Sequence, residues 1–284
     1  PSIGVHVEHF TAETDLEALQ KDLCSDSRGK EIKLIYAETP ANPTNAVIDL
    51  EGLGSLKQAL KDTYLTDVKL AVDNTYLGPI WQKPMEWGAD MSCYSATKFL
   101  SGHSDLIAGA VTGTAECILA IKTLRTFLGN MASPNTCWLL TRSLETLSIR
   151  MNRQAENALQ VVTFLQGHPA VTRVYFPGLD GQGASQVAIH HKQSPSSGAM
   201  ISFDVKGGES AAFHVLNSFH LIKLAVSLGS NESLAQHPFH MTHADVPDDE
   251  KESLQLTASM IRLSVGIEAP EDLIEDLRQA MESL

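Results

Sequence analysis

The 284-residue chain is poor in cysteine and in positive charge, and each shortage excludes a class of protein. No two of its four cysteines share the close CxxC spacing of zinc or redox sites, so we expect no disulfide framework and no cysteine-bound metal. Lysine and arginine number 21 against 34 aspartates and glutamates, which gives a net charge of -13. This charge repels phosphate backbones and anionic lipid, so nucleic acid is not an expected partner.

Long apolar runs are also missing. No stretch approaches the roughly 20 apolar residues of a membrane helix, and the start of the chain has no basic segment followed by an apolar one. We therefore expect a soluble, cytoplasmic protein with no membrane partner. The first residue is Pro1 rather than Met, which favours a natural N-terminus further upstream.

The first half alternates short apolar runs with helix-like stretches, the pattern typical of a parallel sheet covered by helices. Strands are expected at 32–36, 69–73, 91–95 and 106–112, and helices at 53–60 and 116–127. Two of these strands end on polar residues, Asp73 and Ser95. Because ligands of open α/β sheets gather at the carboxyl ends of the strands, this edge is the predicted site.

The second half has the composition of a smaller α+β unit. One long or gently broken helix is expected over 135–166, followed by strands at 171–176, 199–205, 223–226 and 261–265 and helices at 209–218 and 270–284. The segment 178–198 is rich in Gly, Ser and Gln and predicts a surface loop with His190 and His191 exposed. The predicted domains are therefore 1–148, α/β, and 149–284, α+β.

The segment 71–109 carries the strongest chemical signal. Asp73 ends one strand, and 25 residues later Lys98 follows the next strand in the run Ser95-Ala96-Thr97-Lys98. A carboxylate that keeps a pyridine nitrogen protonated and a lysine that forms an imine are the parts that a pyridoxal 5′-phosphate (PLP) site requires. A lone SxTK run would be better explained as a surface turn. Here the aspartate, the two hydroxyls and the positions at strand ends together favour a PLP site.

Several motifs together resemble one family, the PLP-dependent enzymes of cysteine and methionine metabolism, and within it the methionine γ-lyases most. They are ETPANPT from Glu38, VDNT from Val72, SATK from Ser95, GHSD from Gly102, YFPGL from Tyr175, SLG from Ser227, QHP from Gln236 and IRLSVG from Ile261. The resemblance implies an aspartate-aminotransferase-like (fold type I) PLP domain with a smaller α+β C-terminal domain. It also implies PLP as the cofactor and a homotetramer built from dimers that share active sites.

The resemblance assigns the cofactor residues one by one. Lys98 matches the lysine that binds PLP and later moves protons between substrate carbons, and Asp73 matches the partner of the pyridine nitrogen. Ser95 and Thr97 match the hydroxyls that bind the phosphate. Asn42 matches an asparagine that contacts both the cofactor and the substrate.

For the substrate, the resemblance implies that Arg262 and Ser227 hold the α-carboxylate, which suits the planar two-pronged arginine side chain. From the residues alone, two plainer readings stay open. Arg262 would be a structural ion pair, and Asn42 would be a turn residue before Pro43. The histidines at 237, 240 and 243 lie in an irregular segment that contains proline, and no metal site is expected there.

Family members also carry a segment before the point where this chain begins. It supplies a tyrosine stacked on the PLP ring, backbone amides for the phosphate and a Tyr-x-Arg element that reaches the neighbouring subunit. Two alternatives follow. The parent protein is an active enzyme from which this chain lacks one part, or the chain is a non-catalytic oligomerising fragment.

The residue before the Ser227-Leu228-Gly229 motif bears on substrate choice. Cystathionine γ-lyases are expected to carry an acidic residue there, whereas this chain has Val226. An apolar residue suits a thioether such as methionine, which has no distal charge. An acidic side chain at position 226 would then be buried without a cationic partner, which is costly. We therefore predict a carbon–sulfur lyase that performs γ-elimination on a sulfur amino acid, with γ-replacement on an O-acylhomoserine (sulfhydrylase or cystathionine γ-synthase) as the alternative.

Overall fold

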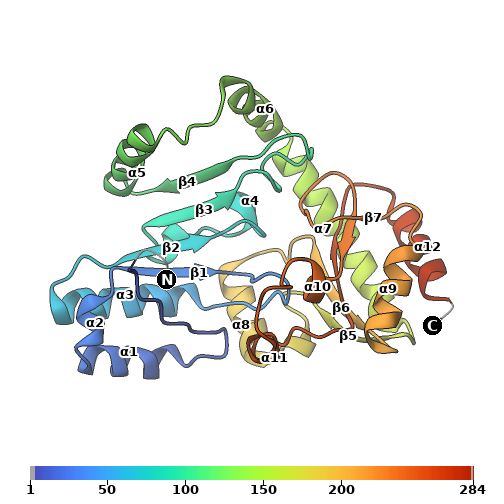
Figure 1. Cartoon of the computed structure of the whole chain (residues 1–284), viewed down its shortest axis with the longest axis horizontal. Coiled ribbons are helices and arrows are strands. Elements are labelled where there is room, and N and C mark those ends of the chain that lie inside the picture. Colours follow the sequence, from blue (N-terminus) through green and yellow to red (C-terminus); the bar gives the residue numbers. More distant parts are fainter. Residues whose placement is uncertain (1–3, 283) are drawn as a thin grey trace.

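The computed structural model describes residues 4–282 and 284, and Figure 1 shows two sheets, each packed against its own helices. The first sheet has the strand order β1-β2-β3-β4. Its strands are β1 (Leu34–Glu38), β2 (Lys69–Asp73), β3 (Met91–Ser95) and β4 (Gly109–Gly113). Each prediction for these strands is confirmed to within a few residues. The architecture is mixed α/β, as predicted.

Helix α3 (Leu50–Tyr64) covers one face of this sheet. Its apolar residues recur at helical spacing, and Leu53 and Leu60 are fully buried against Ile35 and Val72. Asp49 caps the helix by accepting a hydrogen bond from the Glu51 N–H, which satisfies one of the free amides of the first turn. Helices α1 (Leu16–Ser25) and α2 (Arg28–Glu31) lie outside α3 and extend this layer.

The prediction of a parallel sheet is confirmed for three strands and wrong for the fourth. β1, β2 and β3 are parallel, but β4 runs antiparallel to β3. The connection between β3 and β4 contains no long crossover helix and folds back directly, which permits only antiparallel pairing. Thr97 fixes this fold-back, because its N–H donates to Ala108 O and its Oγ1 accepts from Ala108 N–H at 3.0 Å.

The second sheet has the order β5-β6-β9-β8-β7 and forms the larger core. Its strands are β5 (Val171–Tyr175), β6 (Met200–Val205), β7 (Lys223–Leu224), β8 (Leu234–Gln236) and β9 (Met260–Ser264). Every residue of β6 and β9 is buried, because helix α9 (Gly208–Ser218) packs against both strands, and α12 (Pro270–Met281) packs in turn against α9. The domain boundary at residue 148 stays a prediction.

Of the two forms expected for 135–166, one long helix or a gently broken one, the structure has the broken form. The segment forms α6 (Pro134–Leu144) and α7 (Leu147–Gly167), and α5 (Ala115–Leu128) precedes them. α7 packs against the second sheet through polar as well as apolar residues. The buried amide of Gln154 donates to Ser230 O and Val265 O, and that of Asn157 donates to Gly266 O and Glu268 O.

The prediction of a surface loop over 178–198 is wrong. The segment contains the 3-10 turn η2 (Asp180–Gln182) and helix α8 (Ala184–Gln193), and His190 is only 2% exposed. The polar composition was misleading because three glutamines form hydrogen bonds with the backbone of residues 44–50. These are Gln182 with Thr44 O and Asn45 O, Gln186 with Val47 N, and Gln193 with Ile48 O and Leu50 N.

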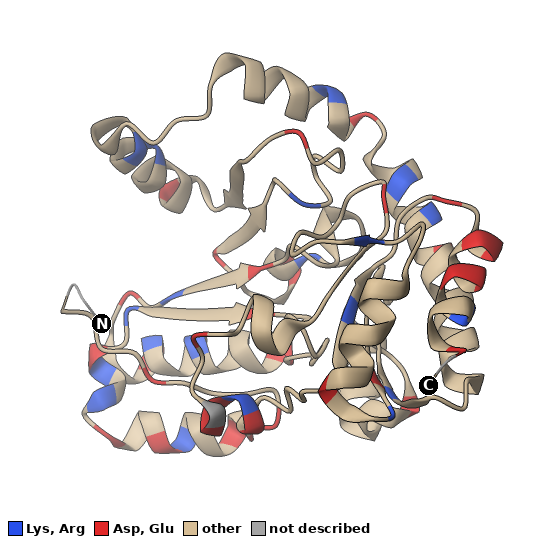
Figure 2. Cartoon of the chain, turned by 45° about the vertical axis from the view of Figure 1, so that its right-hand side comes forward, with Lys and Arg blue, Asp and Glu red and all other residues tan. Residues whose placement is uncertain are grey.

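The remaining short elements are α4 (Gly78–Trp81), η1 (Pro84–Trp87), α10 (Pro238–Met241) and α11 (Asp248–Ser253). On the side shown in Figure 2, acidic and basic residues are interspersed along α1 and α2, and acidic residues mark α12. In the part of the chain that the structure describes, no helix has both the length and the apolar character needed to span a membrane.

Arg150 connects α7 to the turn after β3 and to the end of α6. It is 5% exposed and donates to three backbone carbonyls, Phe99 O at 2.9 Å, Leu100 O at 3.3 Å and Ser143 O at 3.0 Å. Its side chain also fills the space above Gly102, where an added Cβ would lie 1.9 Å from Nη1. The turn that carries Lys98 is therefore held from behind by a buried guanidinium.

Replacing Arg150 by methionine is expected to lower the free energy of unfolding by about 3 kcal/mol, because three buried carbonyls lose their donor. Urea denaturation monitored by circular dichroism measures the change. Arg142→Met on the exposed face of α6 is the matched control and should change stability by less than about 0.5 kcal/mol. Equal losses in both variants would contradict the supporting role of Arg150.

Candidate active site

The predicted site residues meet at the carboxyl ends of β1, β2 and β3. Glu38, Asp73 and Ser95 are the last residues of these strands, and Glu38 pairs with Asp73 in the β1–β2 register. Lys98 follows β3 in a turn, and Asn42 lies in the loop after β1. The C-terminal half contributes Arg262 from β9 and Ser227 from the loop after β7. The structure thus brings together residues that are more than 200 positions apart.

Asp73 is held by donors from β1 and from the turn after β2. Its Oδ1 accepts from the Thr75 N–H at 3.0 Å and from the Thr75 hydroxyl at 2.6 Å, and its Oδ2 accepts from the Tyr36 hydroxyl at 3.2 Å. Thr75 Oγ1 in turn accepts from the Ser95 N–H at 2.9 Å. No lysine or arginine pairs with Asp73 among the described residues, so its negative charge is available to a ligand.

Lys98 is partly buried, and its Nζ lies 3.3 Å from Ser227 Oγ. No carboxylate pairs with this amine in the described part of the chain. Burial lowers the pKa of Lys98, and the nearby Arg262 charge lowers it further. A larger share of the amine is therefore neutral than in an exposed lysine, as a nucleophile or a base requires.

Gly229 allows the Ser227 loop to lie against the Lys98 turn. Its φ is +77°, and an added Cβ would lie 2.7 Å from Phe99 N and 3.0 Å from the Lys98 carbonyl carbon. A side chain at this position would force the two segments apart. The close approach explains why the SLG motif needs its glycine.

Arg262 is a buried cation without an anionic partner. It is 2% exposed, and its guanidinium donates from Nη1 to Asn42 Oδ1 at 3.0 Å and from Nη2 to Val226 O at 2.8 Å and Ser227 O at 3.0 Å. Its Nε has no partner, and burial lowers its pKa. The reading of Arg262 as a structural ion pair is wrong, because no carboxylate among the described residues contacts it.

Tyr76 and Glu38 belong to the site but were not singled out from the sequence. The Tyr76 hydroxyl donates to Asn42 Oδ1 at 2.7 Å, and Glu38 Oε1 accepts from the Asn42 N–H at 2.8 Å. Although solvent reaches Glu38, protein atoms surround its carboxyl group closely, and this desolvation raises the pKa to about 7. The Asn42 N–H opposes this rise. Asn42 is therefore more than a turn residue before Pro43.

The two predicted phosphate hydroxyls differ. Ser95 Oγ has no hydrogen-bond partner among the described residues, so it is free to bind a ligand. Thr97 Oγ1 already accepts from Ala108 N–H and lies 3.3 Å from Ala108 O. Thr97 would have to release the weak second bond in order to donate to a phosphate.

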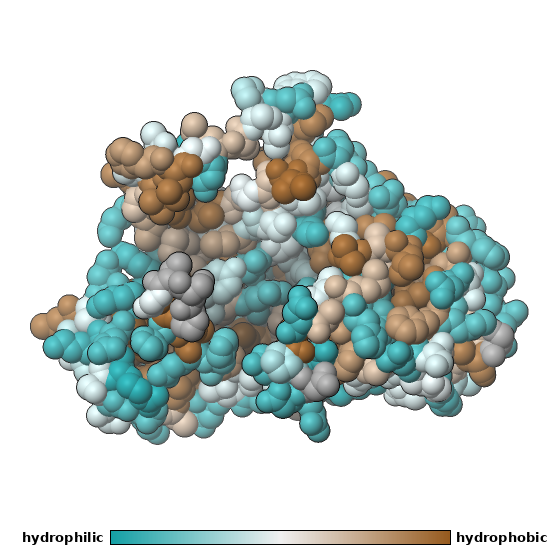
Figure 3. All heavy atoms as spheres, viewed as in Figure 1, coloured by the Kyte–Doolittle hydropathy of each residue, from teal (hydrophilic) through white to brown (hydrophobic). Residues whose placement is uncertain are grey.

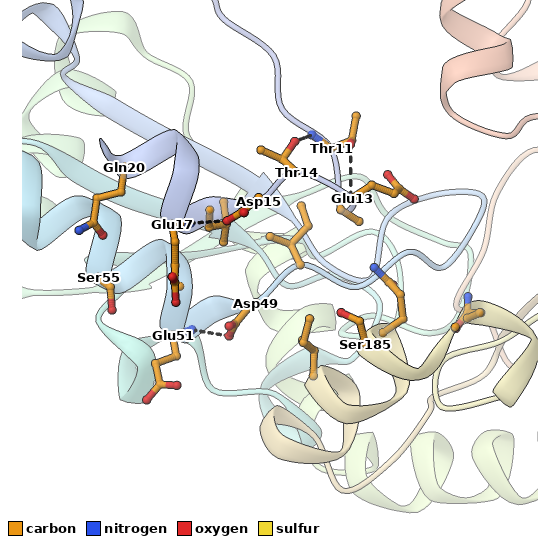
Figure 4. Close-up of a pocket in the computed structure, with 18 of the residues that line it drawn as sticks. Thr11, Glu13, Thr14, Asp15, Glu17, Gln20, Asp49, Glu51, Ser55 and Ser185 are labelled. Carbon is orange, nitrogen blue, oxygen red and sulfur yellow. Dashed lines mark hydrogen bonds between the residues drawn. The ribbon is translucent and has the colours of Figure 1, made fainter. Parts of the chain in front are cut away.

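A cavity of about 1040 Å³ lies elsewhere and contains none of these residues. Figure 4 shows its lining at the N-terminal ends of α1, α3 and α8. The Asp15 and Asp49 carboxylates on its wall accept from the first amides of α1 and α3. These carboxylates serve as helix caps. We place the site at Lys98 because its amine, the Asp73 carboxylate and the Arg262 guanidinium come together there.

The histidines of the 237–243 segment have protein partners. His237 Nε2 lies 2.8 Å from Ala258 O, and His240 Nε2 lies 2.9 Å from Glu209 Oε2. The two rings stack with centroids 5.3 Å apart. No group of three or more potential metal ligands occurs among the described residues.

The residues present fit PLP. Lys98 offers an amine of lowered pKa, Asp73 a carboxylate without a cationic partner, Ser95 a free hydroxyl and Arg262 a buried charge that still lacks an anion. Fold and site together define the class of fold type I PLP-dependent enzymes.

The chain belongs to the Cys/Met metabolism PLP-dependent enzyme family, whose model matches residues 2–282. It is 40% identical over 273 residues to an L-methionine γ-lyase of Fusobacterium nucleatum subsp. polymorphum, covering 95% of this chain and 67% of that protein. It is also 40% identical to the human cystathionine γ-lyase, covering 89% and 61%. The crystal structure of an apo methionine γ-lyase from Micromonospora echinospora matches with a TM-score of 0.87 and 34% identity, covering 98% and 72%.

Replacing Gly229 by alanine tests the contact between the Ser227 loop and the Lys98 turn. Gly129 is the matched control, because its φ is +72° and no atom lies within 4 Å of an added Cβ. Gly129→Ala should cost about 1 kcal/mol for the left-handed backbone alone. Gly229→Ala should cost about 1–3 kcal/mol more, because the new methyl group overlaps Phe99. Thermal unfolding of both variants measures the difference, and equal losses would refute the close approach.

Proposed function

We propose that this chain forms the greater part of a PLP-dependent lyase that performs γ-elimination on a sulfur amino acid such as methionine, with 2-oxobutanoate, ammonia and a thiol as products. The observation that carries the proposal is Lys98 Nζ, an amine without an anionic partner, beside the buried and unpaired Arg262 charge. An amino acid offers the carboxylate that Arg262 lacks. PLP offers the aldehyde that the amine binds.

Bound PLP supplies an electron sink that makes the α-proton of an amino acid acidic. In the proposal, Lys98 binds the cofactor and then carries protons between the substrate's α- and β-carbons and the γ-substituent. Its lowered pKa supports this role, because a base that works near neutral pH must lose and regain its proton easily. Asp73 would keep the ring nitrogen protonated, and its bonds to Thr75 and Tyr36 fix the orientation of its carboxylate. Ser95 and Thr97 would hold the phosphate.

The substrate carboxylate is assigned to Arg262, with Asn42 and Ser227 beside it. The Arg262 guanidinium donates only to uncharged oxygens. Binding of a carboxylate would stabilise it strongly, because hydrogen bonds between charged groups are roughly twice as strong as those between neutral ones. We call Arg262, Asn42 and Ser227 the carboxylate clamp. The Ser227 hydroxyl also contacts Lys98 Nζ, so it links the clamp to the amine.

Val226, which precedes Ser227, is apolar and 50% exposed, and its carbonyl accepts from Arg262. A side chain of this kind offers no charged partner to a substrate. This supports a thioether over a substrate with a charged distal end. γ-Replacement on an O-acylhomoserine shares the same early proton transfers, but the relatives described above are named as lyases.

We also propose a cytoplasmic homotetramer. The unpaired cysteines, the net charge of -13 and the family resemblance support this. Large apolar side chains are exposed on and beside α5 and α6, and Figure 3 shows an apolar area at the position of α5. They are Leu119, Leu124, Phe127, Leu128, Met131 and Trp138. Apolar groups gathered in this way favour contact with further protein.

The cofactor assignment predicts a fixed adduct on Lys98. The purified chain incubated with PLP should show the absorption band of a Schiff base, and borohydride followed by mass spectrometry should locate the adduct on Lys98. Before reduction, the Schiff-base band should form at lower pH than it does on exposed lysines, because imine formation needs the neutral amine and the pKa of Lys98 is lowered. Lys98→Ala should lose the band, whereas Lys122→Ala on the exposed side of α5 should keep it. An adduct found only on other lysines would overturn the assignment.

The reaction assignment predicts 2-oxobutanoate and ammonia in equal amounts from L-methionine. Lys98→Ala should lower the rate by at least about 100-fold, because the proton carrier is lost. A coupled dehydrogenase assay for 2-oxobutanoate measures it. Thioether formation from O-acetylhomoserine and a thiol, without release of 2-oxobutanoate from methionine, would instead support γ-replacement. An adduct on Lys98 without turnover of any of these substrates would support the non-catalytic fragment.

A further inference from the structure

The Tyr76 hydroxyl makes a contact that none of the family motifs assigns. Tyr76 lies in the turn after β2 and is 5% exposed. Its hydroxyl is 2.7 Å from Asn42 Oδ1, and the same oxygen accepts from Arg262 Nη1 at 3.0 Å. One amide oxygen thus joins three separate segments, the turn after β2, the loop after β1 and strand β9.

The chemistry of the three groups fixes the orientation of the Asn42 amide. A guanidinium has only donors, so the atom that faces Arg262 must be Oδ1 and not Nδ2. The Tyr76 hydroxyl must then donate its proton to Oδ1. Burial raises the pKa of Tyr76, although the Arg262 charge opposes the rise, so this proton is retained near neutral pH. Nδ2 has no acceptor among the described residues and remains available to a ligand.

We propose that Tyr76 is a positioning residue for the carboxylate of the substrate. Its hydroxyl holds Asn42 in the rotamer that keeps Oδ1 on Arg262 and leaves Nδ2 free. The carboxylate clamp is therefore preorganised in the absence of ligand. This inference rests on the proposed function for its biological meaning, but the geometry that it invokes belongs to the chain alone.

Hexanoate is a suitable probe, because it has a carboxylate and an apolar tail but no amine with which to engage PLP. Isothermal titration calorimetry on the PLP-free chain measures its dissociation constant, and hexanamide reports binding of the tail alone. Tyr76→Phe keeps the buried ring and removes only the hydroxyl. It should weaken hexanoate about tenfold, the effect of one hydrogen bond, and leave hexanamide unchanged.

The matched control is Tyr175→Phe. It removes another buried hydroxyl, 2% exposed and 2.7 Å from Asp204 Oδ2, outside the proposed site. This variant should lose stability but bind hexanoate within twofold of the unaltered chain. A structural role alone would instead move both tyrosine variants together.

A double-mutant cycle tests whether Tyr76 acts through Asn42. Because the two side chains share one hydrogen bond, Tyr76→Phe combined with Asn42→Ala should bind hexanoate no more weakly than Asn42→Ala alone. If the two substitutions instead weaken hexanoate binding independently, so that their fold-changes multiply in the double variant, the inference is wrong. Hexanoate binding unchanged by Tyr76→Phe, or no hexanoate binding by the unaltered chain, would also overturn it.

The adduct experiment separates this inference from the proposed function. If the Lys98 adduct forms but Tyr76→Phe does not change the hexanoate dissociation constant, the positioning role is refuted and the PLP assignment stands. The expected hexanoate pattern without any Lys98 adduct would support the role of Tyr76 in an anion clamp and overturn the PLP assignment.

Discussion

The arrangement of the site depends on a positive charge that has been taken out of water and left without a partner. Arg262 lies in a strand whose residues are all buried, and each acceptor that it reaches is an uncharged oxygen. Burying an arginine in this way is unfavourable, and the protein tolerates it because neutral dipoles surround the guanidinium. Together with burial, the same charge lowers the pKa of Lys98, and it orients Asn42. Arg262 thus joins the second sheet to the edge of the first.

Most of the fold could be predicted from the sequence because the apolar periodicity of its elements is clear. The strands that end in Asp73 and Ser95 have short apolar runs with polar ends, and the prediction that ligand-binding groups gather there agrees with the geometry. The direction of β4 was missed, although the short connection after β3, which has no room for a crossover helix, favours antiparallel pairing. Helix α8 was missed because composition cannot distinguish a solvated glutamine from one that serves the backbone of another loop.

The site was predicted less completely than the fold. Lys98, Asp73, Asn42 and Arg262 were found through motifs, and the structure brings them to one place. Tyr76 and Arg150 were missed, although Tyr76 stands three residues after Asp73. Its hydroxyl matters only because the loop after β1 folds over it, and a contact of that kind leaves no local signal in the chain. Arg150 likewise acts on carbonyls about 50 residues away.

The way in which η2 and α8 hold the 44–50 segment has an evolutionary consequence. Gln182, Gln186 and Gln193 bond to backbone amides and carbonyls of that segment, which every amino acid except proline can supply in full. At these contacts the path of the loop behind Asn42 does not depend on which side chains the loop carries. Substitutions of the partly exposed Thr44 and Ala46 can therefore accumulate without moving the asparagine, whereas Asn45, which donates to Tyr175 O and Met200 O, and the capping Asp49 are constrained by their own side chains.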